Sequence, residues 1–167
     1  TATAGPVTPV SCFGGNNGSA TLNVNGGQGP YTYQWSNNAT TNAINGVGAG
    51  TYRVVVTTAT GCTTNEPITI TQPATALAAP ASVTGNVSCF GGSNGQASVN
   101  ASGGTGPYAY SWNSSPAQST ATATLLSAGT YIVNVTDANG CAASSTVNIT
   151  EPPMLTGNAS AASVTCN

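Results

Sequence analysis

Apolar and polar residues alternate along several short segments of the chain, and each segment is bounded by Gly, Pro, Asn or Ser. This period of two predicts β-strands that turn one face toward a core. The predicted inward-facing sets are Ala20, Leu22 and Val24; Tyr31, Tyr33 and Trp35; Tyr52, Val54 and Val56; and Ile68 with Ile70. Between the second and third sets, Ile44 and Val47 are the only sizeable apolar residues of a Thr/Asn-rich stretch. Helical periodicity is missing, so we expect no helix longer than a turn or two.

The whole pattern then occurs a second time. Cys89 follows Cys12 by 77 residues, and Cys141 follows Cys62 by 79 residues. The second inward-facing sets are Ala97, Val99 and Ala101; Tyr108, Tyr110 and Trp112; Tyr131, Val133 and Val135; and Val147 with Ile149. A period of this length matches a small domain and exceeds a solenoid repeat. We therefore assign repeat 1 to residues 1–77, repeat 2 to 78–154 and the start of a third repeat to 155–167.

Each repeat predicts an all-β sandwich. Short strands with frequent turn residues are typical of this class. Trp35 in the third-strand position and Tyr52 at the start of the penultimate strand fit an immunoglobulin-like plan, in which such a tyrosine forms a corner hydrogen bond. A short proline-bearing linker between about Pro73 and Val83 should give tandem domains arranged as beads in a semi-rigid rod.

Charge is nearly missing from the chain. Its 167 residues include one Lys or Arg, which is Arg53, and three acids, which are Glu66, Asp137 and Glu151. A protein that binds nucleic acid or anionic lipid needs cations to neutralise phosphates, so we expect no nucleic-acid partner and no electrostatic membrane binding. We also expect no membrane insertion, because no run of about 18 apolar residues occurs.

The repeated blocks resemble a known family. Each copy contains V-S-C-F-G-G-x-x-G, then G-P-Y-x-Y-x-W, then A-G-T-Y-x-V-x-V-T and finally I-T-[QE]-P. These blocks look like the SprB repeat of the gliding-motility surface adhesins of Bacteroidetes, which is related in style to PKD-type domains. The resemblance implies a long extracellular filament, exported by the type IX route, that binds surfaces or polysaccharide and moves along the cell during gliding.

An enzyme is not expected. The chain has no His, no Lys and a single Asp, so no Ser–His–Asp, Ser–Lys or Cys–His arrangement can form. Glu66 and Glu151 belong to different repeats, which makes a glycosidase carboxylate pair improbable. We predict no cofactor, no catalytic residue and no metal site; isolated cysteines without histidine make zinc a weak competitor. The predicted function is a structural or adhesive segment at the cell surface.

Two other function classes stay open. The Tyr31, Tyr33 and Trp35 set could form the stacking platform of a carbohydrate-binding module, although same-face aromatics in a middle strand are more often core. Phe13 and Phe90 lie in Gly-rich corners, where they either pack at a junction or contact a ligand. The third class is a passive spacer in a secreted multidomain enzyme. A neutral surface rich in Ser and Thr would also suit attached sugar, O-linked more than N-linked.

The cysteines predict a disulfide framework in an oxidising, extracellular location. One pair in each repeat favours Cys12–Cys62 and Cys89–Cys141, which would leave Cys166 to pair with a residue beyond Asn167. An objection comes from the immunoglobulin order, which puts the first corner and the last hairpin at opposite ends of a sandwich. Cys12–Cys141, joining neighbouring repeats, is the alternative.

The expected partners of the chain are neighbouring repeats, other copies in a filament, and a polysaccharide or surface ligand.

Overall fold

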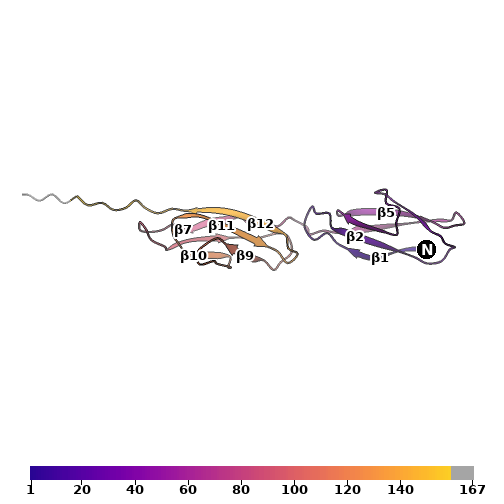
Figure 1. The fold of residues 1–167 in the computed structure, drawn as a ribbon, viewed down its shortest axis with the longest axis horizontal. Coiled ribbons are helices and arrows are strands. Elements are labelled where there is room, and N and C mark those ends of the chain that lie inside the picture. The colour runs from indigo at the N-terminus through magenta and orange to yellow at the C-terminus, as the bar shows by residue number, and fades with distance from the viewer. Residues whose placement is uncertain (159–167) are drawn as a thin grey trace, which may run out of the picture. The chain divides into compact units, whose positions relative to one another are not determined.

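The computed structural model describes residues 1–158, and this part of the chain contains twelve β-strands and no helix. The first six strands are β1 (Ala2–Thr8), β2 (Gly18–Val24), β3 (Thr32–Trp35), β4 (Ala43–Val47), β5 (Gly50–Thr57) and β6 (Thr63–Ile70). The next six are β7 (Ala81–Gly85), β8 (Gly95–Val99), β9 (Ala109–Trp112), β10 (Thr122–Leu126), β11 (Gly129–Thr136) and β12 (Ala142–Ile149). The predicted all-β class is confirmed (Figure 1).

The strands form four three-stranded sheets. Their orders are β1-β2-β4 and β3-β5-β6 in the first repeat, and β7-β8-β10 and β9-β11-β12 in the second. Each order groups the first, second and fourth strands of a repeat apart from the third, fifth and sixth. This is the A-B-E and C-F-G grouping of an immunoglobulin-like sandwich without its D strand. Paired strands run antiparallel, for example Gly50–Thr57 of β5 against Thr63–Ile70 of β6.

Contacts divide the described chain into two compact units. The first unit takes all of repeat 1 and, in addition, two short segments of repeat 2: its ranges are Thr1–Ala79, Ala101–Ala109 and Val135–Ala143. The second unit has the ranges Pro80–Asn100, Tyr110–Asn134 and Ser144–Asn167, of which residues up to 158 are described. Residues 101–109 and 135–143 of repeat 2 are therefore grouped with repeat 1 by their contacts.

The core of the first unit lies between its two sheets. Trp35 of β3 is 1% exposed, and Val54 of β5 is completely buried. Their main apolar neighbours from both sheets are Val10, Ala20, Leu22, Ile44, Val56, Ile68 and Ile70. Tyr31, Tyr33 and Tyr52 are partly buried and pack against this cluster. The predicted inward faces are thus confirmed for the tryptophan and valines, while the tyrosines lie at the margin of the core.

Polar groups of the large aromatics are satisfied by backbone carbonyls. The Tyr52 hydroxyl donates to the carbonyl of Gly48 at 3.0 Å, and Tyr131 donates to Ser127 at 3.1 Å. These bonds are the predicted tyrosine corners. The indole N–H of Trp35 donates to the carbonyl of Thr41 at 2.8 Å. A buried indole therefore also fixes the Thr/Asn-rich stretch that leads to β4.

Two strands per repeat carry little signal in the sequence. Only Ala2 of β1 is buried, and β7 has no fully buried residue. These first strands were not predicted, since a strand that covers the margin of a core needs no run of large apolar side chains. β4 and β10 coincide with the weakly apolar stretches around Ile44 and Leu126.

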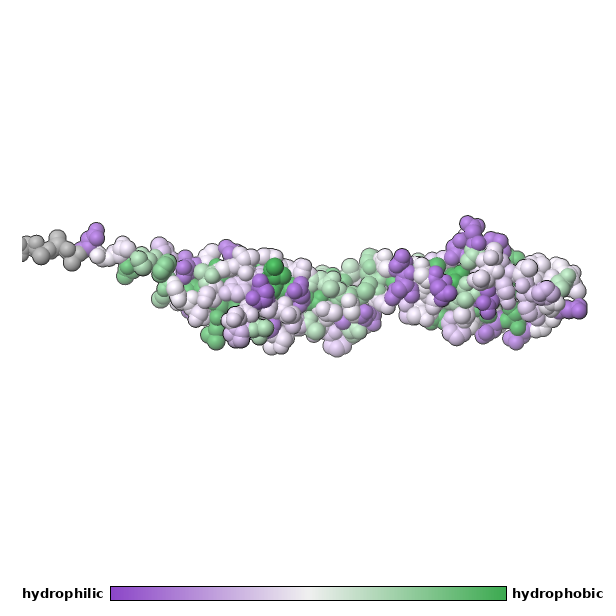
Figure 2. Space-filling view, viewed as in Figure 1, coloured by the Kyte–Doolittle hydropathy of each residue, from purple (hydrophilic) through white to green (hydrophobic). Residues whose placement is uncertain are grey.

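The described surface is mostly neutral. Figure 2 shows a face coloured largely in pale shades, with strongly hydrophilic and strongly hydrophobic residues in separate small groups. None of the helices that a membrane crossing would require is found among residues 1–158. Neutral polar side chains and backbone groups therefore make the contacts with solvent that charged residues make on most protein surfaces.

Neighbouring valines of β5 provide a test of the core. Val54→Ala should lower the free energy of unfolding by about 2 kcal/mol, because it removes two methyl groups from a site without access to water and leaves a cavity. Val55→Ala, on the same strand with Val55 41% exposed, should change stability by less than about 0.5 kcal/mol. Chemical denaturation measures both. Equal losses for the two variants would contradict the assigned faces of β5.

Candidate functional site

The first unit contains a disulfide between residues far apart in sequence. Cys12 lies in the corner between β1 and β2, and Cys141 lies in the turn between β11 and β12. Their Cα atoms are 5.7 Å apart, their sulfurs 2.06 Å apart, and the sequence separation is 129 residues. Since each immunoglobulin-type sheet lacks cysteine within its strands, this bond is of a different kind from the buried inter-sheet disulfide of antibody domains.

The corner around Cys12 is held by hydrogen bonds of its own. The side-chain amide of Asn17 accepts from the Ser11 N–H at 3.0 Å and donates to the Ser11 hydroxyl at 2.8 Å. Gly15 N–H donates to the carbonyl of Cys12 at 2.9 Å, and Gly14 N–H donates to the Gln72 side chain at 2.8 Å. These bonds fix the direction in which the cysteine leaves the backbone.

Asp137 organises the turn that carries Cys141. Its carboxylate accepts three backbone N–H groups, from Thr105, Asn139 and Cys141, each at 2.9 Å. The residue is 6% exposed. Burial by itself raises the pKa of Asp137, but the N–H donors of Thr105, Cys141, Asn139 and Gly140 outweigh it and hold the pKa below its ordinary value. The carboxylate therefore stays ionised and keeps the turn closed.

The Cys12 corner and the Asp137 turn are also joined by a hydrogen bond, and together they line one hollow. The Asn139 side chain donates to the carbonyl of Ser11 at 3.0 Å. The Phe13 ring lines a shallow hollow with Leu77, Gly104 and the disulfide itself. We call this set, residues 11–13 with 76–77, 104–105 and 137–141, the junction.

The linker is part of the junction. Ala78 and Ser102 exchange two backbone hydrogen bonds of 2.8 and 2.9 Å, and Gly104 N–H donates to the carbonyl of Thr75 at 3.0 Å. Gly103 has φ of +72°, and a Cβ there would overlap the carbonyl of Ala76. Only glycine allows this approach, so the predicted linker is bound to the turn that follows β8.

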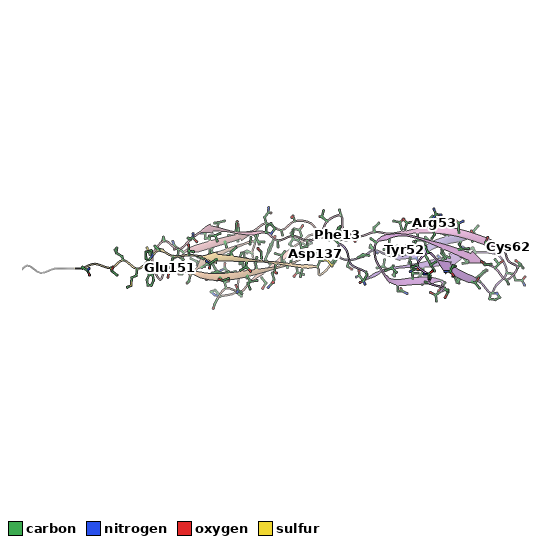
Figure 3. The ribbon with its side chains drawn as sticks, turned by 90° about the horizontal axis from the view of Figure 1, so that it is seen from above. Phe13, Tyr52, Arg53, Cys62, Asp137 and Glu151 are labelled. Carbon is green, nitrogen blue, oxygen red and sulfur yellow. A yellow bond between two sulfur atoms is a disulfide. The ribbon has the colours of Figure 1, made fainter. Side chains whose placement is uncertain are left out.

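The predicted pairings Cys12–Cys62 and Cys89–Cys141 are wrong in this structure. Val10 N–H donates to Thr71 O at 2.8 Å, which places the Cys12 corner beside the end of β6, whereas Cys62 precedes its start. Eight strand residues separate such ends by about 25 Å, while bridged Cα atoms lie within about 7 Å. Figure 3 accordingly shows Phe13 and Cys62 toward opposite ends of repeat 1.

The same reason applies to the second predicted pair. Val87 N–H donates to Thr150 O at 2.9 Å, so Cys89 lies beside the end of β12, and Cys141 precedes its start. Cys62 and Cys89 are exposed and unpaired among the described residues. The predicted pairing of Cys166, like the third repeat around it, lies outside the described residues.

The aromatic residues give no tryptophan platform. Trp35 and Trp112 are 1% and 2% exposed, which removes both indoles from any sugar-stacking surface. Phe13 and Phe90 are instead the exposed rings, at 49% and 55%. Phe13 belongs to the junction, and Phe90 lines a hollow with Pro152, Met154 and neighbouring residues.

Titratable groups do not gather in one place. Residues 1–158 contain no group of three or more His, Cys, Asp or Glu side chains that could hold a metal ion. The Asp137 carboxylate accepts backbone hydrogen bonds, among them one from the Thr105 N–H. Glu151 accepts from the Gly91 N–H at 2.7 Å. The chemistry that this arrangement supports is covalent cross-linking by disulfides.

Comparisons with known proteins agree with the repeat. The model of the SprB repeat family matches residues 4–40 and 81–117. These matched segments contain most of β1 with β2 and β3 of repeat 1, and β7 to β9 of repeat 2, including the Cys12 and Cys89 corners. No curated protein sequence matches the chain.

Among solved structures, a C-terminal 282-residue fragment of intimin, solved with the translocated intimin receptor, is similar at 20% identity and a TM-score of 0.48. The match covers 89% of this chain and spans 63% of the length of that fragment. Murine CEACAM1b is similar at 14% identity and a TM-score of 0.35, covering 91% of this chain and 100% of its own. The eight N-terminal Ig domains of DSCAM match at 12% and 0.38, covering 91% and 25%.

Replacing Asp137 by Asn should destabilise the protein at neutral pH. A carboxylate whose folded pKa lies below its unfolded value adds stability above the unfolded pKa, near 3.9, and loses it as pH falls through the folded pKa. The difference in melting temperature between wild type and Asp137→Asn should therefore be largest above about pH 5 and shrink in stronger acid. A difference that stays constant with pH would show that the charge of Asp137 plays no part.

Proposed function

Since the chain contains two SprB repeats, we propose that it is a non-enzymatic, load-bearing segment of a long extracellular surface filament or adhesin. In this function the repeats carry force between the cell and a surface, as in surface adhesion and gliding. The observation that carries the proposal is the Cys12–Cys141 disulfide, which connects the opening corner of one repeat with the last hairpin of the next.

A covalent bond at this place changes how the chain responds to force. Tension on the two ends passes through the disulfide, so the chain between Cys12 and Cys141 cannot be drawn out while the bond is intact. Without it, the strands would be held against extension only by hydrogen bonds and by the packing of the core. In the chain-entropy model, closing a loop of this length also contributes about 4–5 kcal/mol.

The disulfide also supports an extracellular location, because such bonds persist in oxidising compartments and are rare in the cytosol. The neutral surface supports contacts with neighbouring repeats, other copies in a filament, or an uncharged surface such as polysaccharide, since none of these needs a charged partner. Export by the type IX route and attached sugar belong to the same proposal.

A carbohydrate-binding module is less well supported. Both indoles are buried, and the Phe13 ring faces the junction. Phe90 is the ring left for a ligand contact in repeat 2, at 55% exposed. Retention of the chain on polysaccharide that is lost in Phe90→Ala and kept in Val83→Ala would favour this second function. A passive spacer would show neither retention nor resistance to force.

Single-molecule pulling from the two termini tests the load-bearing function. The disulfide bypasses a sequence separation of 129 in a chain of 167 residues. At about 3.5 Å per extended residue, roughly 450 Å of chain should therefore be withheld from extension when the protein is oxidised. Reductant, or the Cys12→Ser substitution, should release this length.

Cys89→Ser serves as the matched control, because it removes a corner cysteine that is unpaired here and should leave the withheld length unchanged. An oxidised wild-type chain that extends as far as the Cys12→Ser variant would contradict a load-bearing role. Labelling of intact producing cells by an antibody against the chain tests the location separately, and labelling only after permeabilisation would argue against the cell surface.

A further inference from the structure

The corner of the junction occurs a second time at Ser88–Gly92. Asn94 accepts from the Ser88 N–H at 3.0 Å and donates to the Ser88 hydroxyl at 2.8 Å, and Gly92 N–H donates to Cys89 O at 2.9 Å. These bonds match those around Cys12 in partners and in length. The corner therefore takes the same form whether its cysteine is bonded or not, so it is preorganised for a bond.

The hairpin of the junction also has a second copy. Thr58 N–H donates to Cys62 O at 2.9 Å, as Asp137 N–H does to Cys141 O. The Thr58 hydroxyl accepts from the Cys62 N–H at 3.1 Å, in the position of the Asp137 carboxylate. A hollow of about 160 Å³ lies beside Cys62 and is lined by residues that include Gly27 and Thr58.

The exposure of the cysteine side chains distinguishes the bonded corner and hairpin from their unbonded copies. Cys12 and Cys141 are half-buried in the junction, whereas Cys62 and Cys89 are exposed. Phe90 lines a hollow with Pro152 and Met154 of the following segment, as Phe13 lines one with Ala76 and Leu77. The two exposed thiols are therefore at the same positions in the repeat as the two bonded cysteines, but both are unpaired among the described residues.

We propose that Cys89 and Cys62 are the two halves of a recurring inter-repeat docking site, in which the Cys89 corner binds the last hairpin of a following SprB repeat and the Cys62 hairpin binds the corner of a preceding one. The occupant of each half is another SprB repeat. This inference rests on the proposed function, because it extends one load-bearing disulfide into a series. The contact is heterologous, since corner meets hairpin, and such contacts propagate without closing.

The covalent step is thiol–disulfide exchange with a disulfide oxidant such as oxidised glutathione. The Cys89 thiolate, having lost its proton to solvent, attacks one sulfur of the oxidant and releases one reduced glutathione. The Cys62 thiolate of the docked repeat then attacks the Cys89 sulfur of the mixed disulfide and releases a second reduced glutathione. Two thiols are oxidised, and one oxidant disulfide is reduced to two thiols.

One difference between the hairpins predicts how well Cys62 docks. Asn139, which donates to the carbonyl of Ser11, has Thr60 as its counterpart in repeat 1. Thr60→Asn should restore that donor toward the carbonyl of an incoming Ser88. Docking through the Cys62 hairpin should therefore strengthen in this variant, by an amount equal to one hydrogen bond.

The test uses the 167-residue chain in a glutathione redox buffer, with the cross-linked species digested without reduction and mapped by mass spectrometry. Random collision of these two exposed thiols gives Cys62–Cys62, Cys89–Cys89 and Cys62–Cys89 links in the ratio 1:1:2, because either chain can contribute either cysteine of the mixed link. Docking should make the Cys62–Cys89 link between chains exceed twice the amount of each symmetric link, and the excess over that factor is the measured quantity. In Thr60→Asn this excess should rise by about fivefold, the ratio to which a net 1 kcal/mol per hydrogen bond converts.

Asn94→Ala, which removes the support of the Cys89 corner, should abolish the excess. Asn17→Ala makes the same change at the bonded corner and is the matched control, expected to keep the excess. Links in random proportion, with Cys12–Cys141 found intact in the same digest, would overturn this inference and leave the proposed function standing. A digest without Cys12–Cys141 would instead remove the observation on which the proposed function rests.

Discussion

Each repeat depends on closing two small sheets over one tryptophan. Trp35 and Trp112 are the largest fully buried side chains, and the residues around them are mainly valine, alanine and isoleucine. A domain of this size buries a modest share of its surface, so the loss of one large buried group removes a large part of its stability. The indole N–H must also find an acceptor, and the carbonyls of Thr41 and Thr120 provide it.

That constraint explains why irregular segments are as well determined as the strands. The Thr/Asn-rich stretch before β4 has few apolar groups of its own, but the indole bond to Thr41 fixes it against the core. The tyrosine corner of Tyr52 does the same for the turn before β5. Buried polar groups thus fix the loops as well as satisfying their own hydrogen bonds.

A nearly uncharged chain still needs local electrostatics at its turns. Gly14 N–H donates to Gln72, and the equivalent Gly91 N–H donates to Glu151, so an amide and a carboxylate fill the same position. Thr58 and Asp137 likewise occupy equivalent turns. The carboxylate is present where the turn carries a bonded cysteine, and its three N–H donors make that turn the more rigid of the two.

The sequence by itself determined the repeat, the all-β class, the inward faces of β2, β3, β5 and β6, and the tyrosine corners, because a period of two and turn residues are local signals. β1 and β7 escaped it, because Ala2 is the only fully buried residue of the two strands. The partner of Cys12 could be decided only by the tertiary structure. Equal numbers of cysteines per repeat suggest self-contained units. In space, however, the two cysteines of each repeat lie at opposite ends of an eight-residue strand, β6 or β12. A disulfide forms only where the fold brings two Cα atoms within bonding range, and the fold does this for Cys12 and Cys141.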